Sequence, residues 1–424
     1  MIRPTKVVLL SFEGPDVYSQ VGGLGVRVTE LADALAYRGY DVDLIFIGDP
    51  NAPPVEERGP RLRLRRWSQW ISAYHPRDVY DGETGKMNDY TASVPRFVAE
   101  EIVAPASARG ERVLIMAEEW HTVPATIALD RLLRERHLRH SATILWNANN
   151  TYGFWTIDWA ALHYAATITT ISKYMKFEVA AASGVQPLVV NNGIPSRLLD
   201  GAPKAETAAW RSALGERPTL VKVGRFDPDK RWFQAIDALE RLIRSEDVDT
   251  RLVIRGGNQA YGHEVLARAR NHGLEVTEIE RVADDNALFD AVARAPGQII
   301  DLKVFLTQEL LYGLYAAGSA VLANSGKEPF GLVGLEVMAA GGLAVCGSTG
   351  EEYAEPYVNS IVVDTDDGRE LATALISVMK DEKLAGRMRS EGYETAKRFT
   401  WPTIIDALER KLEFIEAAQF EKAF

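Results

Sequence analysis

Short apolar runs alternate with segments of helical periodicity along most of the chain. The apolar runs lie at 6–12, 41–47, 112–117, 142–147, 166–172 and 187–192 in the first half, and at 219–225, 250–257, 274–280, 320–325, 343–348 and 360–364 in the second. Runs of this length between turn residues predict buried strands, and the periodic segments between them predict helices. Their alternation predicts right-handed βαβ units and parallel sheets covered by helices.

The distribution of turn-forming residues also predicts where the two domains meet. Residues 191–210 are rich in turn residues, and a linker is expected near 195–215. We therefore expect two doubly wound α/β domains, residues 1–198 and 199–399. An amphipathic helix at 400–424 would complete the first domain. Gly39 stands where the C-cap of the first helix belongs.

Composition narrows the class of protein. The chain has 424 residues, 46% of them hydrophobic and 25% charged, which is ordinary for a globular enzyme. A net charge of −11 argues against nucleic-acid binding through the overall field. The single cysteine, Cys346, excludes an intramolecular disulfide and fits a reducing compartment. The sequence shows neither a signal-peptide pattern nor an apolar segment of membrane-spanning length, so a cytoplasmic location is expected.

A glycine turn follows the first predicted strand. Gly22, Gly23 and Gly25 would let backbone N–H groups approach an anion at a helix N-terminus. Tight packing of the strand against the helix explains the same glycines equally well. The spacing is not G-x-G-x-x-G, and Asp49 lies past the end of the second predicted strand, so a nicotinamide cofactor is not expected.

Charged residues gather after two predicted strands of the second domain. Arg225 directly follows one strand and Lys230 comes five residues later, which suits a diphosphate at the carboxyl edge of a parallel sheet. Glu328 is expected in a loop before Pro329, and Glu336 in the first or second turn of a helix that starts near Leu332 and ends at Gly341–Gly342. Taken alone, the segment with Arg225 and Lys230 can also be a solvated turn, and the segment with Glu328 and Glu336 an ordinary buried helix with an acidic start. Together they describe a nucleotide-sugar pocket.

Three motifs carry a family resemblance. "GRFDPDK" (224–230), "EPFGLVGLEVMAAG" (328–341) and "NNGI" (191–194) resemble the retaining glycosyltransferases of family GT4, which includes glycogen, sucrose and trehalose synthases. Weaker similarity extends to "EEWHT" (118–122), "ITTISKYMK" (168–176) and "RFTW" (398–401). The resemblance implies a GT-B fold, with two Rossmann-like domains facing across a cleft and a last helix that crosses back to the first domain.

The resemblance also implies roles for individual residues. Arg225 and Lys230 would grip the diphosphate, Glu328 would bind the donor sugar, and Glu336 the ribose. Glu119 would approach the sugar as the family's acid. Further donor contacts would come from the loop of Gly22 and Gly23, from Asn149, and from Phe330, Gly331 and Leu332. No metal or other cofactor would be required.

Two positions depart from the polymer synthases of the family. Gln20 stands where these enzymes usually carry a lysine, and Asn149 stands where they carry a histidine. Asparagine can donate to a sugar hydroxyl but cannot titrate, so no proton transfer is assigned to Asn149. Asn149 could equally be a plain turn residue. The expected reaction is retaining transfer of a hexosyl group, glucose foremost, from a nucleoside-diphosphate sugar to a carbohydrate or small hydroxyl acceptor.

Several alternatives remain open at this point. They are a sugar phosphorylase, a nucleotide-sugar epimerase, a non-catalytic binding protein and a peripheral enzyme with a lipid acceptor. The basic stretch 58–77 offers membrane-surface contact, although a solvated edge strand protected by charge is the favoured interpretation. Trp120 and Cys346 are expected to pack in the core, and His121 to be structural.

Overall fold

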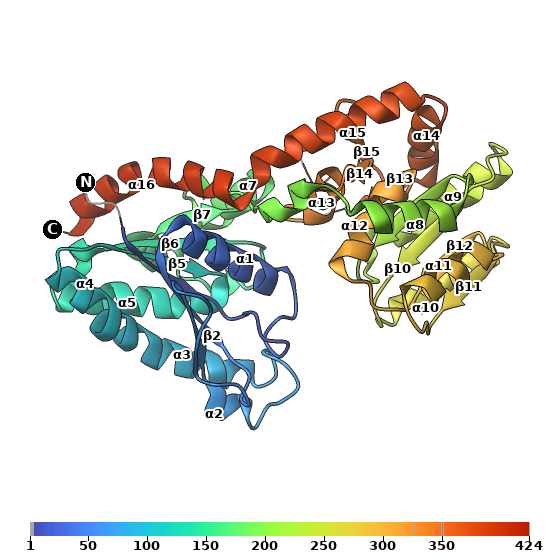
Figure 1. Cartoon of the computed structure of the whole chain (residues 1–424). Helices are drawn as coiled ribbons and strands as arrows, with labels where there is room; N and C mark the ends of the chain where they lie inside the picture. The colour runs from blue at the N-terminus through green and yellow to red at the C-terminus, as the bar shows by residue number, and fades with distance from the viewer. Residues whose placement is uncertain (1–3, 327, 349, 351, 424) are drawn as a thin grey trace. The chain divides into compact units, whose positions relative to one another are not determined.

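The computed structural model describes residues 4–326, 328–348, 350 and 352–423. The chain divides into two compact units, residues 1–195 with 400–424, and residues 196–399. Both are α/β units in which helices cover a parallel sheet, as the apolar pattern predicts (Figure 1).

The N-terminal unit is built on an eight-stranded sheet of order β3-β4-β2-β1-β5-β6-β7-β8, in which the antiparallel pair β3–β4 is the exception to parallel pairing. Its strands are β1 (Lys6–Leu10), β2 (Asp41–Ile47), β3 (Val55–Glu57), β4 (Leu62–Trp67), β5 (Val113–Glu118), β6 (Ala142–Ala148), β7 (Thr167–Thr170) and β8 (Leu188–Val189). Its helices are α1 (Gly23–Arg38), α2 (Gln69–Ser72), α3 (Glu83–Phe97), α4 (Ala104–Ala108), α5 (Val123–Glu135), α6 (Trp159–Ala165), α7 (Lys173–Ser183) and α16 (Trp401–Ala423).

The C-terminal unit has a seven-stranded, all-parallel sheet of order β11-β12-β10-β9-β13-β14-β15. Its strands are β9 (Thr219–Val223), β10 (Arg251–Arg255), β11 (Val276–Ile279), β12 (Ile299–Leu302), β13 (Ala320–Ala323), β14 (Ala344–Cys346) and β15 (Ile361–Val362). Its helices are α8 (Lys204–Leu214), α9 (Trp232–Arg244), α10 (Tyr261–Asn271), α11 (Asp285–Arg294), α12 (Gln308–Ala317), α13 (Leu332–Ala339), α14 (Gly368–Met379) and α15 (Glu382–Ala396).

Local signals in the sequence set several element ends. Gly39 adopts the left-handed conformation (φ 106°) and donates its N–H to the last turn of α1, as the C-cap prediction requires. The apolar run in β2 is buried almost throughout, which is typical of a strand covered on both faces. Helix α13 begins at Leu332, where the sequence places it.

The predicted linker was too long, because its second half is α8. Trp210 on α8 is fully buried and donates its indole N–H to the carbonyl of Leu310 at 2.8 Å. Its ring also contacts Phe289 edge-on, with ring centroids 5.0 Å apart. The turn-forming residues at 193–203 therefore form the connection, and α8 belongs to the core of the C-terminal unit.

Strand β12 was missed by the apolar pattern. Its sequence, Ile-Ile-Asp-Leu, places a charged residue in a short run that begins two residues after Gly297. The run is nevertheless buried at every position, because β12 lies between β10 and β11 in the sheet. Neighbouring strands, which the local sequence does not encode, make this segment a strand.

The basic stretch is not an edge strand. β4 lies inside the sheet, paired with β2 on one side and with β3 on the other. Arg65 binds the buried carboxylate of Asp43 at 2.5 Å, and Arg66 binds Asp16 at 2.8 Å. The other arginines at 58, 61 and 63 also pair with carboxylates of the same unit. These ion pairs explain a cluster of positive charge within an acidic chain.

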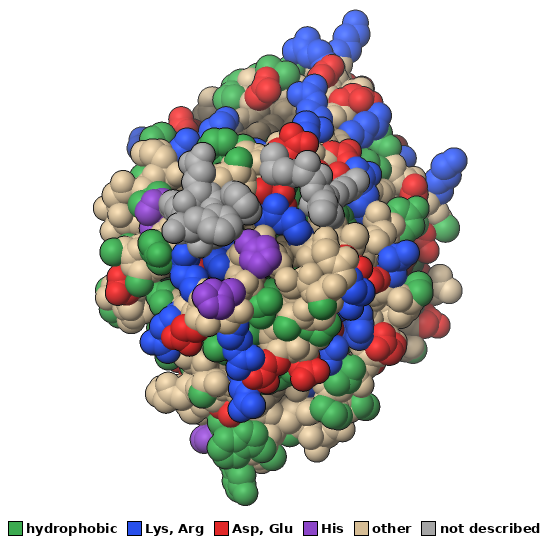
Figure 2. All heavy atoms as spheres, turned by 90° about the vertical axis from the view of Figure 1, so that its left-hand side faces the viewer, with side chains coloured by type: hydrophobic (Ala, Val, Ile, Leu, Met, Phe, Trp, Pro, Cys, Tyr) green, Lys and Arg blue, Asp and Glu red, His purple; other side chains and the backbone are tan. Residues whose placement is uncertain are grey.

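One face of the molecule illustrates how charged side chains are distributed. On the face that Figure 2 shows, Lys and Arg side chains are interspersed with Asp and Glu side chains instead of forming a patch of one sign. Within the described residues, no helix is long and apolar enough to cross a membrane.

Candidate functional site

The loop after β9 presents the two cations that the sequence singles out. Arg225 is exposed, and its carbonyl accepts a hydrogen bond from the indole N–H of Trp232 at 2.9 Å. Residues Pro228–Lys230 form a 3₁₀ turn, in which the Asp227 carboxylate accepts from the backbone N–H of Asp229. The carbonyl of Asp229 accepts from the N–H of Gly326 at 2.8 Å, which ties this loop to the loop after β13.

Lys230 and Glu328 come together as an ion pair between these two loops, with one fifth of each side chain exposed. Burial, and then the positive charge of Arg225, lower the pKa of Lys230 from its ordinary value of 10.5 to about 8. The Lys230 ammonium is therefore held in a place where an additional negative charge would stabilise it. The structure thus joins two of the predicted residues, although their roles toward a ligand remain predictions.

The Pro-Phe-Gly-Leu element shapes the start of α13. Phe330 is buried, and Gly331 adopts φ 77° as the N-cap, with no side chain capping the helix. The hydroxyl of Tyr353 donates to the carbonyl of Gly331 and fixes this turn. Leu332 opens α13, so the first free N–H groups of the helix lie directly after the loop that carries Glu328.

Glu336 lies in the second turn of α13 and is half-buried. Its negative charge reaches the hydroxyls of Tyr315 and Tyr353. Burial and this charge raise the pKa of both tyrosines. The interaction of Tyr353 with the neighbouring Cys346 side chain raises the pKa of Tyr353 further.

A pocket of about 590 Å³ opens at the same edge of the sheet. Its lining comes from the ends of β10 and β12, from the loop after β10, and from Phe226, the residue next to Arg225. Gly256 and Gly262 pack against the Phe226 ring, and a Cβ at Gly256 would approach that ring to 1.9 Å. The pocket was not predicted, since β12 was not, although "RGGN" (255–258) after an apolar run was an available signal.

Glu119, the predicted acid of the N-terminal unit, follows β5 and is buried. Its carboxylate oxygen Oε1 accepts hydrogen bonds from the backbone N–H groups of Asn149 and Asn150 at 2.7 and 3.1 Å. Burial raises the pKa of Glu119 to about 8 against the effect of these bonds, and the charge of Glu118 raises it further. At neutral pH Glu119 is therefore mostly a neutral acid that can donate a proton.

The backbone of Glu119 is strained. With φ 68° and ψ 166° it occupies a region that is essentially reserved for glycine and costs about 1–3 kcal/mol. Its carbonyl accepts hydrogen bonds from Trp146 at 3.0 Å and from the Thr122 hydroxyl at 2.9 Å, and these contacts hold the conformation. Strain that the surroundings maintain around an acid is typical of a functional position.

The raised pKa of Glu119 gives a test by protein stability. The unfolded chain releases this proton near pH 4.5 and the folded chain near pH 8. Between these values the folded state binds more protons, so the stability that protonated Glu119 contributes is lost as the pH rises. Compared with Glu119→Gln, the wild type should lose about 1.4 kcal/mol per pH unit between about pH 5 and 8. Urea unfolding at several pH values measures this difference, and parallel curves would contradict it.

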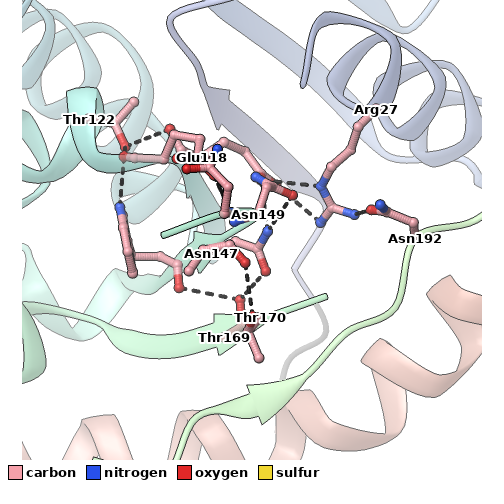
Figure 3. A network of polar contacts seen from close by, with 12 residues as sticks. Arg27, Glu118, Thr122, Asn147, Asn149, Thr169, Thr170 and Asn192 are labelled. Carbon is pink, nitrogen blue, oxygen red and sulfur yellow. Dashed lines mark hydrogen bonds and ion pairs between the residues drawn. The ribbon is translucent and has the colours of Figure 1, made fainter. Parts of the chain in front are cut away.

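Asn149 belongs to a buried polar network (Figure 3). Its side-chain amide donates to Glu118 at 2.7 Å and accepts from Asn147 at 3.1 Å, and it also acts on the Glu119 carboxylate. Glu118 also accepts from Asn147 and is paired with Arg27 at 3.2 Å. Asn149 is therefore held by side-chain contacts and is more than a turn residue.

Arg27 is the cation of this network and was missed by sequence reasoning. It lies on α1 with 2% exposure, bonds Glu118 through two nitrogens, and donates to the side chain of Asn192. Its guanidinium lies 5.6 Å from the ring centre of Trp401 at the start of α16. One side chain thus joins α1, the end of β5, the "NNGI" segment and the last helix. An arginine on the buried face of a predicted helix was the available signal.

The glycine turn before α1 already holds an anion. The carboxylate of Glu13 accepts from the backbone N–H groups of Gly22 and Gly25 at 2.9 and 3.0 Å. The hydroxyl of Tyr80 donates to its other oxygen at 2.6 Å. In this structure Glu13 takes the place that the sequence analysis considers for a ligand. A donor contact of Gly22 would therefore have to share its N–H with Glu13 or displace that carboxylate.

The remaining candidates are mostly structural. His121 is buried between Phe12 and Trp120 and pairs with Glu83 at 2.7 Å, and burial lowers its pKa. Cys346 is buried in β14, and burial raises its pKa to about 12, so it stays a thiol. Trp120 is partly exposed, not a core residue. In the part of the chain that the structure describes, no group of three or more His, Cys, Asp or Glu is arranged to hold a metal.

Comparison with known proteins gives a consistent result. Residues 205–395 match the family model described as glycosyl transferases group 1. The chain is 26% identical over 432 residues to the glycogen synthase of Mycobacterium tuberculosis, covering 95% of this chain and 93% of that one. It is 24% identical over 404 residues to the D-inositol 3-phosphate glycosyltransferase of Xylanimonas cellulosilytica, covering 90% and 88%.

A solved structure shows the same fold. The catalytic domain of starch synthase IV from Arabidopsis thaliana, bound to ADP and acarbose, matches with a TM-score of 0.68 at 14% identity. The match covers 99% of this chain and 100% of that one. The C-terminal unit therefore carries a group 1 glycosyltransferase domain, and the chain as a whole has the GT-B fold.

Proposed function

We propose that this glycosyltransferase moves a hexosyl group, glucose foremost, from a nucleoside-diphosphate sugar to a carbohydrate or small hydroxyl acceptor, with retention at the anomeric carbon. The observation that carries the proposal is the Lys230–Glu328 pair at the carboxyl edge of the C-terminal sheet. Ligands of open α/β sheets bind at this edge. Exposed Arg225 and the pocket beside Phe226 extend the same edge, and they suit a diphosphate and its nucleoside respectively.

The ion pair suggests how the donor is received. A diphosphate carries more charge than one carboxylate, so it would compete with Glu328 for the Lys230 ammonium. Glu328 would then be free to accept hydrogen bonds from hydroxyls of the donor sugar. Arg225 and the N-terminus of α13, with Phe330, Gly331 and Leu332, would add charge stabilisation, and Glu336 is proposed to bind the ribose. The donor contacts of Gly22, Gly23, Glu119 and Asn149 remain predictions from the resemblance.

The chemical step follows from the same arrangement. As the bond from the anomeric carbon to the phosphate oxygen breaks, negative charge grows on the diphosphate, where Lys230 and Arg225 stabilise it. The departing phosphate oxygen then accepts the proton of the acceptor hydroxyl, which attacks from the same face. We propose that these cations and the α13 dipole neutralise the leaving group without a metal, so activity should withstand EDTA.

The decisive experiment is a donor screen on the full chain. A donor that binds only the folded state raises the melting temperature, so UDP-, ADP- and GDP-sugars are tested by thermal shift. The donor that binds is then incubated with carbohydrate acceptors, and proton NMR of the product reports its anomeric configuration. Inversion would reject the retaining mechanism. Sugar release that needs inorganic phosphate and no nucleotide would point instead to a phosphorylase.

The pKa of Lys230 gives a second test of donor binding. The diphosphate needs the ammonium form, which is depleted above about pH 8. Affinity for a nucleoside diphosphate should therefore fall above pH 8, approaching tenfold per pH unit, as calorimetry can measure. The Lys230→Arg variant stays charged and should show a flat profile over the same range. A wild-type profile as flat as that of the variant would contradict the assignment.

A further inference from the structure

Asp301 is a buried residue that lines the pocket of the C-terminal unit. It is 2% exposed, and it lines the pocket of about 590 Å³ from β12. Within residues that the structure describes, its carboxylate has neither a hydrogen bond nor an ion pair. A carboxylate that lines a pocket without a protein partner is available to accept hydrogen bonds from a ligand.

The other charged groups of the pocket are already engaged. Glu278, which lies opposite Asp301 on β11, holds Arg270 at 2.9 Å and also binds Lys303. Lys303 reaches Glu280 at 3.1 Å as well. Arg255 donates its Nε–H to the carbonyl of Val304 at 3.3 Å. Arg270 and Lys303 therefore pair with Glu278 and Glu280, and among the described residues no ion pair reaches Asp301.

Burial raises the pKa of Asp301 to about 6, with the charge of Glu278 adding to the effect and that of Lys303 opposing it. Asp301 is thus mostly ionised at neutral pH and can only accept hydrogen bonds. A ligand group that fits it must offer donors, and two neighbouring donors would match both carboxylate oxygens.

The pocket also has a surface for a flat ring. Phe305 lines it and is 81% exposed, an unusual position for a large aromatic residue. A nucleotide base that stacks on the Phe305 ring would turn one of its hydrogen-bonding edges toward the interior of the pocket. Since Phe226 joins the pocket to the loop of Arg225 and Lys230, a nucleotide with its diphosphate at these cations would place its base here.

We propose that Asp301 reads the base of the sugar donor and that this base is guanine. The inference rests on the function proposed above and names its donor. Guanine presents N1–H and the N2 amino group side by side, two donors for the two oxygens of Asp301. Uracil presents a single N–H between two carbonyl oxygens, which a carboxylate repels. Adenine and cytosine each offer one amino donor beside a ring nitrogen that accepts, so they make one contact at most.

The test is calorimetric titration of the full chain with GDP, IDP, UDP and ADP. GDP should bind about 10- to 100-fold more tightly than UDP or ADP, the discrimination typical of a bidentate contact. IDP lacks the N2 amino group and keeps N1–H, so its affinity should lie between those of GDP and UDP. Tighter binding of UDP or ADP than of GDP would overturn the proposal while leaving the proposed glycosyl transfer intact.

The Asp301→Asn variant separates base reading from a structural role. Asparagine accepts one hydrogen bond and donates another, so it cannot accept from N1–H and N2–H of guanine together, and it matches N3–H and O4 of uracil as well as N1–H and O6 of guanine. The ratio of GDP to UDP affinity should fall about 10- to 100-fold, with the melting temperature of the free protein as the check on folding. An equal loss for all four nucleotides would instead place the ribose at Asp301 and overturn the proposal.

Phe305→Ala supplies the matched control. Stacking is tolerant of base identity, so this variant should lower the affinity for all four nucleotides by about 10-fold and keep the order of these affinities. A changed order in Phe305→Ala would mean that Asp301 does not set the preference. Failure of every nucleotide to bind the wild type would remove the proposed function itself.

Discussion

Replacement of Lys230 by alanine is expected to lower kcat/KM for glycosyl transfer by about 100- to 1000-fold, the usual loss when one group that stabilises developing charge is removed. Lys230 is the ammonium that pairs with Glu328, and burial holds its pKa near 8. Because the fold destabilises the charged form of Lys230, its removal should not lower the melting temperature. Activity and melting temperature, measured on one preparation, separate the two effects.

Glu328→Ala should cause a loss of similar size for a different reason. It removes acceptors for the sugar but leaves Lys230 free, so nucleoside diphosphate alone should bind at least as well as to the wild type. Lys397→Ala removes an exposed lysine that pairs with Glu394 and serves as the control, with activity unchanged. Near-normal turnover in either Lys230→Ala or Glu328→Ala would refute their assignment to the active site.

The Arg27→Met variant is expected to lose about 3–5 kcal/mol of unfolding free energy, since it leaves the buried carboxylate of Glu118 without its cation. It also removes the contacts of the guanidinium with Asn192 and the Trp401 ring. For a unit of this size the melting temperature should fall by roughly 10 °C. Denaturant unfolding of the full chain, followed by tryptophan fluorescence, measures the change.

Two further variants identify the cause of this loss. Glu118→Gln in the Arg27→Met background removes the unpaired charge and should restore part of the stability, and a double-mutant cycle gives the coupling energy. Arg131→Met makes the same substitution in an exposed pair with Glu135 and should cost less than about 1 kcal/mol. If Arg27→Met and Arg131→Met behaved alike, the network would contribute nothing specific to this unit.

The Arg27 network has a consequence for the connections of the chain. Asn192 lies just before the crossing at 195/196, and Trp401 just after the return crossing at 399/400. The two segments are joined to each other, since the N–H of Trp401 donates to the carbonyl of Ile194 at 3.0 Å and Gly193 packs against the Trp401 ring. Arg27 therefore fixes both connecting segments to the sheet edge that carries Glu118 and Glu119.

Local patterns in the sequence determined the α/β class, the restart of the pattern in the second half, and most strands and helix ends. Apolar periodicity reflects which face of an element is buried, and it is readable without knowing the neighbours. Motif spacing also placed Lys230, Glu328 and the start of α13 correctly in the fold. These features depend on residues close together in the chain.

Tertiary structure alone decided which charges meet. Glu13 at the N-terminus of α1, Arg27 with Glu118, and the arginines of β4 with Asp43 and Asp16 are all contacts between distant segments. β12 became a strand because β10 and β11 flank it, and only then did Asp301 enter a pocket. A buried charge must find its partner in three dimensions, and a sequence pattern records the charge but not the partner.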